Sequence, residues 1–280
     1  MGERSDNSVT RQYHITDTAA AALVTGGSSG IGRAVCKSLA EKGIRVYEFS
    51  RTGTDNGNIH HVSVDVTDEA CVRGAVGGII AAEGKIDILI NCAGFGIGGA
   101  AEFTQVCDAK KQFDVNFFGM VRVTGAVLPH MRKAGCGRII NVSSVAASVP
   151  IPFQAFYSAS KAAVNSYTGA LANEVRPYGI TVCAVMPGDI STGFTKAREK
   201  NTEGDAEYGG RIGRSLAKME HDEINGMSPA VCGRYIAKVA LKKHVKPYYS
   251  VGFVYKLLCV LIKILPARFA GRVLYGLYAK

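Results

Sequence analysis

The sequence predicts an α/β protein in which helices cover both faces of one parallel β-sheet of about seven strands. Short apolar runs alternate along the chain with longer segments of helical periodicity. Several of these runs are continuous in Val, Ile and Leu and lack polar alternation, which is typical of strands buried on both faces. Hydrophobic residues make up 47% of the 280 residues, which is enough for the core of one large domain.

The predicted strands and helices follow one another in regular order. The strands are expected at 20–26, 44–49, 59–64, 86–91, 138–142, 180–185 and 249–252. Helical patterns between them are clearest at 30–42, 108–133, 155–176 and 229–243. This alternation favours an open, doubly wound sheet of the Rossmann type, because neighbouring parallel strands need a crossover connection.

The chain divides into three predicted parts. A polar N-terminal tail occupies 1–19, the α/β domain occupies 20–252, and an amphipathic helical extension occupies 253–280. Within the domain, residues 189–228 are rich in Gly, Glu, Lys and Arg and show no clear element. Compact domains seldom contain so long a stretch without regular structure, so we predict a mobile, partly helical lid over a site.

Composition narrows the range of partners. The net charge is +10 and the pI is about 9.2, but the sequence has no dense Lys/Arg run, zinc-finger spacing or aromatic RNA-binding motif. We therefore expect an anionic small molecule, no nucleic acid and no metal site.

Cysteine usage and apolar segments bear on localisation. The eight cysteines are scattered without a CxxC pair, as small buried residues are in a reducing compartment. The first residues lack the apolar core of a secretion signal, and the longest apolar stretch, 251–265, is too short and too charged to span a membrane. We expect a cytoplasmic protein, with membrane association through the C-terminal helices as the open alternative.

A glycine-rich turn joins the first predicted strand to the first predicted helix. Gly26, Gly30 and Gly32 follow Thr25 with the spacing GxxxGxG. Glycine lets the backbone turn sharply and approach a pyrophosphate, whose charge then lies at the N-terminus of the helix. This place in the first βα unit favours a dinucleotide site over a turn without a ligand.

The end of the second predicted strand indicates which dinucleotide binds. An acidic residue there bonds the adenosine ribose, whereas a basic residue accommodates a 2′-phosphate. The strand ends in Ser50-Arg51. We therefore expect NADP(H) rather than NAD(H), with a solvated loop cation as the alternative interpretation of Arg51.

Tyr157 and Lys161 share one face of a predicted helix because they are four residues apart. A phenol, with a pKa of about 10, is a poor proton donor or base near neutral pH unless its anion is stabilised. The ammonium of Lys161 favours the phenolate, and Ser144 can donate to a developing alkoxide. Taken singly, the pair is more often a solvated helix surface, and a serine such as Ser144 often only satisfies backbone groups.

Together, these motifs resemble the short-chain dehydrogenase/reductase family over residues 20–192. TGGSSGIG is similar to the family's TGxxxGxG, NCAG is similar to its NNAG motif with Cys92 in place of the second Asn, and the segment 187–192 is similar to its PGxxxT. The resemblance implies a catalytic set of Asn116, Ser144, Tyr157 and Lys161. The residues that it implies for cofactor binding are Gly26, Ser28, Ser29, Gly30, Ile31, Gly32, Arg51, Asp65, Val66, Asn91, Ala93, Gly94, Tyr157, Lys161, Pro187, Gly188 and Thr192.

The resemblance also implies individual roles. Asp65 would bind the adenine, the 187–192 segment would hold the nicotinamide carboxamide, and Lys161 would bind the nicotinamide ribose. Asn116 would hold a water that relays protons to the lysine. Helices such as 108–133 and 155–176 commonly form subunit contacts in this family, so we expect a homodimer or homotetramer.

The extension carries two apolar stripes. Apolar residues recur with helical spacing over 254–265, and a shorter stripe follows Pro266. The stripes can pack on the core or another subunit, wall a pocket for a lipophilic substrate, or lie on a membrane surface. The extension resembles that of family members that act on steroids, retinoids or other hydrophobic alcohols and ketones.

The resemblance thus implies an NADP(H)-dependent oxidoreductase that interconverts an alcohol and a ketone or aldehyde on a steroid-, retinoid- or lipid-like substrate. Two alternatives stay open. A 3-oxoacyl-carrier reductase is disfavoured because the chain lacks the C-terminal VTG…VDGG stretch of such enzymes. A catalytically silent dinucleotide-binding regulator is disfavoured because it has no use for Tyr157.

Overall fold

The computed structural model describes residues 20–280, so the predicted polar tail at 1–19 lies outside the described residues. The strands are β1 (Ala21–Thr25), β2 (Arg45–Ser50), β3 (Ile59–Ser63), β4 (Ile88–Asn91), β5 (Ile97–Gly98), β6 (Gly137–Val142), β7 (Ile180–Pro187), β8 (Glu199–Lys200) and β9 (Tyr248–Val251). The α-helices are α1 (Gly30–Ala40), α2 (Glu69–Glu83), α3 (Val106–Phe113), α4 (Met120–Ala134), α5 (Ala155–Glu174), α6 (Phe194–Ala197), α7 (Arg211–Ile224), α8 (Pro229–Ala240), α9 (Phe253–Ile264) and α10 (Ala267–Tyr278). A π-helical segment, Asp114–Gly119, joins α3 to α4.

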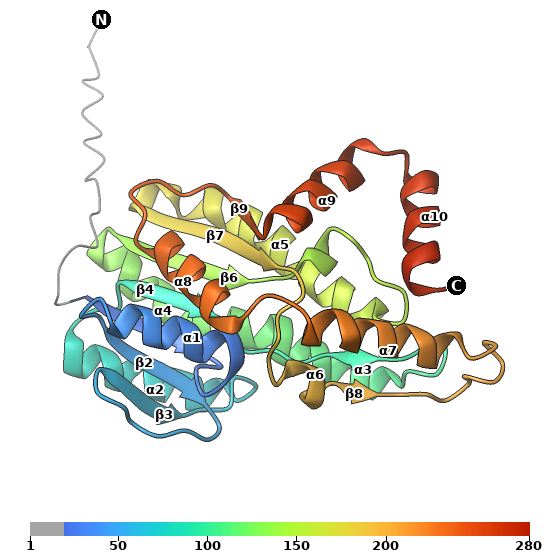
Figure 1. Cartoon of the computed structure of the whole chain (residues 1–280). Coiled ribbons are helices and arrows are strands. Elements are labelled where there is room, and N and C mark those ends of the chain that lie inside the picture. Colours follow the sequence, from blue (N-terminus) through green and yellow to red (C-terminus); the bar gives the residue numbers. More distant parts are fainter. Residues whose placement is uncertain (1–19) are drawn as a thin grey trace, which may run out of the picture.

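The main sheet has seven strands in the order β3-β2-β1-β4-β6-β7-β9, and every pair is parallel (Figure 1). The predicted α/β class and the seven predicted strands are confirmed. β5 and β8 form a separate parallel pair of two residues each, which is too short to leave a pattern in the sequence.

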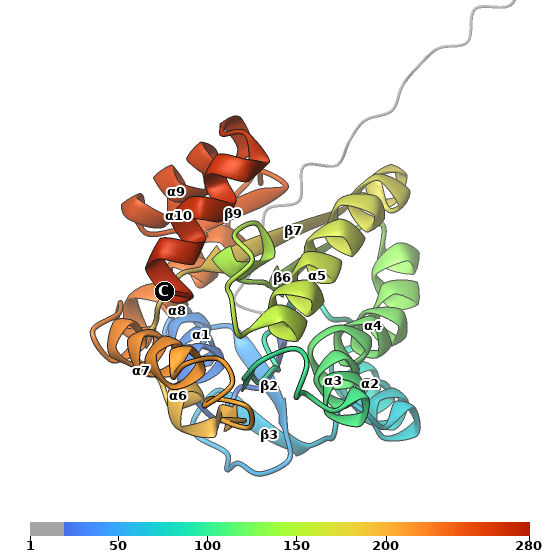
Figure 2. The same cartoon turned by 90° about the vertical axis from the view of Figure 1, so that its right-hand side faces the viewer.

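Helices cover both faces of the sheet, with α1 and α8 on one side and α2, α4 and α5 on the other (Figure 2). Successive residues of β1 point to opposite faces, so Val24 packs in the cluster that contains Leu39 of α1 and Ile236 of α8. Leu23 packs in the other cluster, with Val127 of α4. Burial on both faces explains why the strand is apolar throughout.

The strand order reverses direction between β1 and β4. The chain moves outward from β1 through β2 to β3 and then returns to the other side of β1 as β4. The hydroxyl of Thr25, at the end of β1, accepts hydrogen bonds of 3.0 Å from the backbone N–H groups of Cys92 and Ala93, after β4. Ligands of doubly wound sheets bind at this kind of switch point, at the carboxyl ends of the strands.

The predicted lid, 189–228, contains α6, β8 and α7 and is therefore partly helical. β8 pairs with β5, which ties the segment to the loop after β4. Ile212, Leu216 and Met219 of α7 are buried against Ala100 in that same loop region. Its mobility stays a prediction.

Both apolar stripes of the extension form helices, α9 and α10, as predicted. Cys259 of α9 and Leu274 of α10 are buried in a cluster with Val145 and Val149, which follow β6. Packing on the protein's own core therefore accounts for one face of each helix. Among residues 20–280, no helix combines the length and the apolar character needed to cross a bilayer.

Candidate active site

A cavity of about 450 Å³ opens where the carboxyl ends of β1, β4, β6 and β7 meet. It brings together residues that the sequence predicted separately, from the glycine turn, the NCAG and PG segments, and α5. The predicted residues that line it are Gly26, Ser29, Gly30, Ile31, Gly32, Ala93, Gly94, Ser144, Tyr157, Lys161, Pro187, Gly188 and Thr192. One continuous space thus joins the predicted cofactor site to the predicted catalytic residues.

Other predicted residues lie outside this lining, as the described residues define it. They are Ser28, Arg51, Asp65, Val66, Asn91 and Asn116. The side chain of Asn91 is buried in the interior, where its amide donates to Asn141 at 2.9 Å and to Thr124 at 3.1 Å. This placement joins β4 to β6 and α4, so Asn91 acts on the site by holding the strand ends together.

Asn116 lies in the π-helical segment and braces the loop after β4. Its Oδ1 accepts the backbone N–H of Phe95 at 2.9 Å, and its Nδ2 donates to the Phe95 carbonyl at 3.0 Å. A Cβ atom on Gly94 would lie 3.0 Å from Asn116 Oδ1 and 3.6 Å from Lys161 Nζ. Gly94 thus fills the narrow space between these two side chains, and single π-helical turns of this kind occur often at functional sites.

Tyr157 and Lys161 project from the first two turns of α5 into the cavity. The Lys161 ammonium nitrogen lies 5.9 Å from the centroid of the Tyr157 ring and donates a 3.0 Å hydrogen bond to the Val142 carbonyl at the end of β6. Ser144 caps the short 3-10 turn after β6, where its hydroxyl accepts the Ala146 N–H at 3.1 Å. Strand β6 and helix α5 therefore fix all three groups.

Burial is the main influence on the protonation states of Tyr157 and Lys161. It raises the pKa of Tyr157 to about 12, although the Ser144 hydroxyl beside it acts in the opposite direction by stabilising the phenolate. Burial also lowers the pKa of Lys161 to about 8. At neutral pH the site therefore holds a neutral phenol next to an ammonium, which is the pairing needed to release a proton from the phenol.

Cys92, the departure from the family's NNAG motif, lies beside these groups. Burial raises the pKa of its thiol to about 11, so the thiol is protonated at neutral pH. Cys92 also packs against the core cluster that contains β1 and α1. A packing role fits this environment better than a redox role.

The glycine turn is shaped for close approach by a ligand. A Cβ atom on Gly32 would lie 2.1 Å from the carbonyl oxygen of Gly26, so only glycine fits there. Gly30, Ile31 and Gly32 place the first turn of α1 at the cavity wall, where the helix dipole favours a phosphate.

Arg51 and Asp65 lie near each other beyond the glycine turn. The Ser63 hydroxyl donates to the Arg51 carbonyl at 3.2 Å, and this links the chain after β2 to the end of β3. Hydrogen bonds from the backbone and hydroxyl of Thr67 hold the pKa of Asp65 below its usual range, and Arg51 lowers it further. Asp65 is therefore an ionised acceptor with a cation near it.

The C-terminal helices α9 and α10 also wall the cavity, although the sequence predicted no site residue in them. Tyr255, Leu258, Leu274, Leu277 and Tyr278 all line it. The apolar stripes of the extension were the sequence feature that pointed to this wall, because a pocket wall was one of the three interpretations of the stripes. A cavity wall is the second role that the structure supports for these helices.

Two carboxylates also line the cavity. Asp189 follows the PG segment, and its Oδ2 accepts a 2.6 Å hydrogen bond from the Tyr255 hydroxyl of α9. Burial raises the pKa of Asp189. Glu223 of α7 is partly neutralised, since it forms an ion pair with Arg198 and accepts a 2.6 Å hydrogen bond from Thr195.

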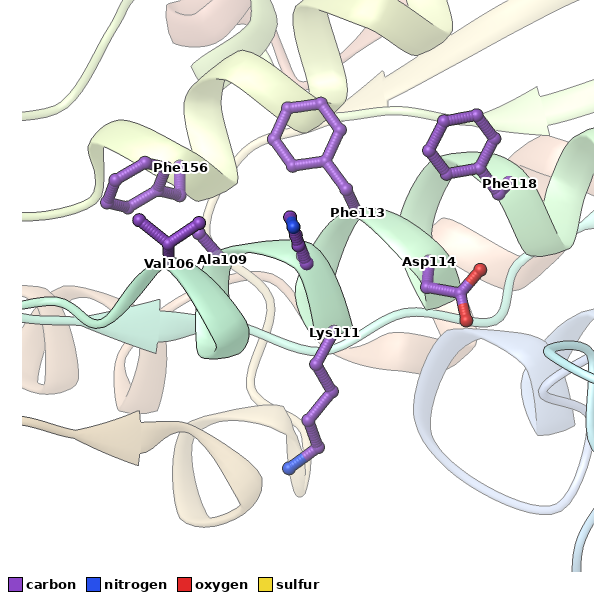
Figure 3. Close-up of a pocket in the computed structure, with 8 residues that line it drawn as sticks. Val106, Ala109, Lys111, Phe113, Asp114, Phe118 and Phe156 are labelled. Carbon is purple, nitrogen blue, oxygen red and sulfur yellow. The ribbon is translucent and has the colours of Figure 1, made fainter.

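A second hollow, of about 590 Å³, lies along α3. Figure 3 shows Phe113, Phe118 and Phe156 around it, while Lys111 points to the other side of α3. None of the residues predicted to be catalytic, Asn116, Ser144, Tyr157 and Lys161, is part of its lining in the described chain. The cavity around Tyr157 is therefore the candidate active site, and the role of α3 to α5 in subunit contacts stays a prediction.

Comparison with known proteins agrees with this geometry. A family model described as short chain dehydrogenase matches residues 20–203. A 3-ketodihydrosphingosine reductase of Bacteroides thetaiotaomicron is 46% identical over 225 residues, which cover 79% of this chain and 84% of that protein.

Solved structures show the same fold. A short-chain dehydrogenase from Streptomyces avermitilis superposes with a TM-score of 0.79 at 28% identity and covers 93% of this chain and 97% of that one. A 3-ketoacyl-(acyl-carrier-protein) reductase from Brucella melitensis, solved with NADH, has a TM-score of 0.70 at 26% identity and covers 83% of this chain and 96% of that one. The chain belongs to the short-chain dehydrogenase/reductase family.

Proposed function

We propose that this protein reduces the ketone of a long-chain, lipid-like substrate with NADPH, and that a 3-keto sphingoid base is its best substrate class. The observation that carries the proposal is the single cavity that the glycine turn, Tyr157 and apolar side chains of α9 and α10 all line. The likeness to a protein named 3-ketodihydrosphingosine reductase supports the substrate class.

The residues fit a dinucleotide. The turn of Gly26, Gly30 and Gly32 and the first turn of α1 would hold the pyrophosphate, and the 187–192 segment would hold the nicotinamide end. Arg51, beside Asp65, would accept a 2′-phosphate, which supports NADPH over NADH. When bound, the reduced nicotinamide supplies a hydride for the carbonyl carbon.

The chain's own residues supply the proton. The Ser144 hydroxyl donates to the carbonyl oxygen and holds it beside Tyr157, whose phenol then gives its proton to the developing alkoxide. The phenolate that forms lies close to the Lys161 ammonium, which stabilises it within a buried site. Apolar side chains of α9 and α10 exclude water while the proton moves.

The two carboxylates support an amino ketone in particular. A sphingoid ketone carries an ammonium on the carbon at one side of its carbonyl and a long alkyl chain on the other side. Asp189 is the less neutralised carboxylate, since Glu223 already pairs with Arg198. An ammonium next to the reacting carbonyl would face Asp189, and the alkyl chain would lie against Leu258 and Leu274.

Two measurements on the purified protein test this proposal. Titration with NADPH and NADH side by side gives the cofactor preference, which we expect to favour NADPH. Cofactor oxidation is then followed with a 3-keto sphingoid base, a steroid ketone, retinal and a carrier-linked 3-oxoacyl chain. Preference for the sphingoid ketone supports the proposal, and preference for the carrier-linked chain would replace it with the carrier-reductase function. Tight NADPH binding without turnover on any carbonyl would favour a regulatory role.

A further inference from the structure

Helix α9 is apolar on two opposite faces, and the described protein covers only one of them. Leu258, Cys259 and Ile262 pack in the cluster with Val145 and Val149. The large apolar residues that stay exposed on α9 are Phe253 at 80%, Val254 at 71%, Leu257 at 51%, Val260 at 48%, Leu261 at 44% and Ile264 at 76%. A helix that is apolar all round is stable in water only when both faces are covered.

Helix α10 adds to this surface. Leu274 is buried, whereas Phe269, Val273, Tyr275 and Leu277 are exposed. Figure 1 shows α9 and α10 as an inverted V at the edge of the molecule, in which α9 rises from the end of β9 and α10 descends towards α7. We call the exposed apolar residues of both helices the tail surface. Apolar surfaces of this kind mark an interaction site, because single exposed apolar side chains are normally scattered.

Charge indicates what covers the tail surface. The basic residues are spread along the chain, but no Asp or Glu follows Glu223. Ten basic residues follow that position: Arg234, Lys238, Lys242, Lys243, Lys246, Lys256, Lys263, Arg268, Arg272 and Lys280. The rest of the chain holds the other 23 of the 33 basic residues and all 23 acidic residues, so its net charge is zero. The whole net charge of +10 thus comes from the last 57 residues.

This excess of positive charge distinguishes between two candidates for covering the tail surface, a second copy of the chain and an anionic lipid surface. Lys256, Arg268 and Arg272 are exposed on α9 and α10, among the residues of the tail surface. A second copy of the chain would bring the same cations against them, and like charges repel in an interface. An anionic lipid surface would bind the cations and also take up the apolar side chains.

The tail surface lies on the same two helices as the cavity wall. Leu258 and Leu274 face the cavity, and Leu277 both lines the cavity and is 46% exposed. We propose that α9 and α10 lie on an anionic membrane surface, with Phe253 and Ile264 inserted among the lipids, so that the apolar end of the cavity faces the bilayer. Docking itself does not depend on the substrate proposed above.

Flotation of the full chain with lipid vesicles tests the docking. We expect the protein to float with mixed phosphatidylcholine/phosphatidylglycerol vesicles and to bind pure phosphatidylcholine much more weakly. Phe253→Ser combined with Ile264→Ser should weaken binding by more than about tenfold, because two large apolar side chains lose their burial in lipid. Arg268→Ala combined with Arg272→Ala should weaken binding to the mixed vesicles by roughly 25-fold, at about fivefold per cation near an anionic surface.

Val106→Ser is the matched control, since Val106 is 66% exposed but lies on α3. It should float like the unchanged protein, and all variants should keep their melting temperature and their turnover of a short, water-soluble ketone. Lack of flotation with either vesicle would overturn the proposal, as would equal loss in the control. If the Phe253/Ile264 variant instead lowers the oligomer mass in light scattering and keeps vesicle binding, a second copy covers the tail surface and the membrane proposal is wrong.

Discussion

Replacement of Lys161 by Met tests how the buried ammonium assists proton transfer. The ammonium nitrogen lies 5.9 Å from the centroid of the Tyr157 ring. If this centroid distance is taken as the separation of the two charges, an effective dielectric constant of about 20 gives a stabilisation of the phenolate of about 3 kcal/mol. A barrier raised by this amount slows the reaction about a hundredfold. Lys161→Met should therefore reduce kcat for ketone reduction by about two orders of magnitude near pH 7, measured at saturating NADPH so that any loss of cofactor affinity is kept separate.

The dependence of kcat on pH is a second measure of how the Lys161 ammonium assists proton transfer. Burial lowers the pKa of Lys161 to about 8 and raises that of Tyr157 to about 12, so the lysine loses its proton first. As the pH rises through about 8, kcat of the unchanged protein should fall towards that of Lys161→Met, whereas the variant should show no such fall. A variant that keeps the full rate, or that keeps the falling limb, would refute the role of this ammonium.

Three further substitutions test separate parts of the site. Tyr157→Phe should lower kcat by at least about a thousandfold, because the phenol is the proton donor, and should change NADPH affinity only a few-fold in a fluorescence titration; retained turnover would remove Tyr157 from proton transfer. Arg51→Ala should weaken NADPH binding by about ten- to a hundredfold and leave NADH binding unchanged, since only NADPH carries the 2′-phosphate; equal losses would exclude that contact. Asp189→Asn should raise KM for a 3-keto sphingoid base by roughly tenfold but not for the same long-chain ketone without its amino group; an equal rise for both ketones would exclude recognition of the ammonium.

Much of the fold could be predicted from local patterns. The inner strands β1, β4, β6 and β7 are recognisable because burial on both faces makes them largely apolar, as in Ile88–Asn91. The edge strands β3 and β9 are less buried and carry a weaker pattern. The segment 108–133 reads as one helix, but the π-helical turn at Asp114–Gly119 divides it, since Asn116 there bonds the backbone of Phe95 across the fold. Helix α7 was not recognised, because the glycines around it obscure the spacing of Ile212, Leu216 and Met219.

The catalytic end of the site was predictable and the substrate end was not. Tyr157 and Lys161 are four residues apart in one helix, so their proximity follows from helical geometry. Asp189 and Tyr255 are 66 residues apart, and their hydrogen bond depends on how α9 packs over the PG segment. The NCAG motif did not predict that the Asn91 side chain is held inside the sheet by Asn141 and Thr124, and the cofactor contact expected of Asn91 stays a prediction.

We infer that this site reduces a long-chain amino ketone with NADPH. The most direct test is a single-turnover reaction of the purified protein with deuterated NADPH, labelled on the nicotinamide C4 position that donates the hydride, and a 3-keto sphingoid base. Mass spectrometry then locates the label in the product. We expect deuterium on C3 of the resulting alcohol and no product with Tyr157→Phe. Unreacted ketone together with bound, unoxidised NADPH would contradict this inference.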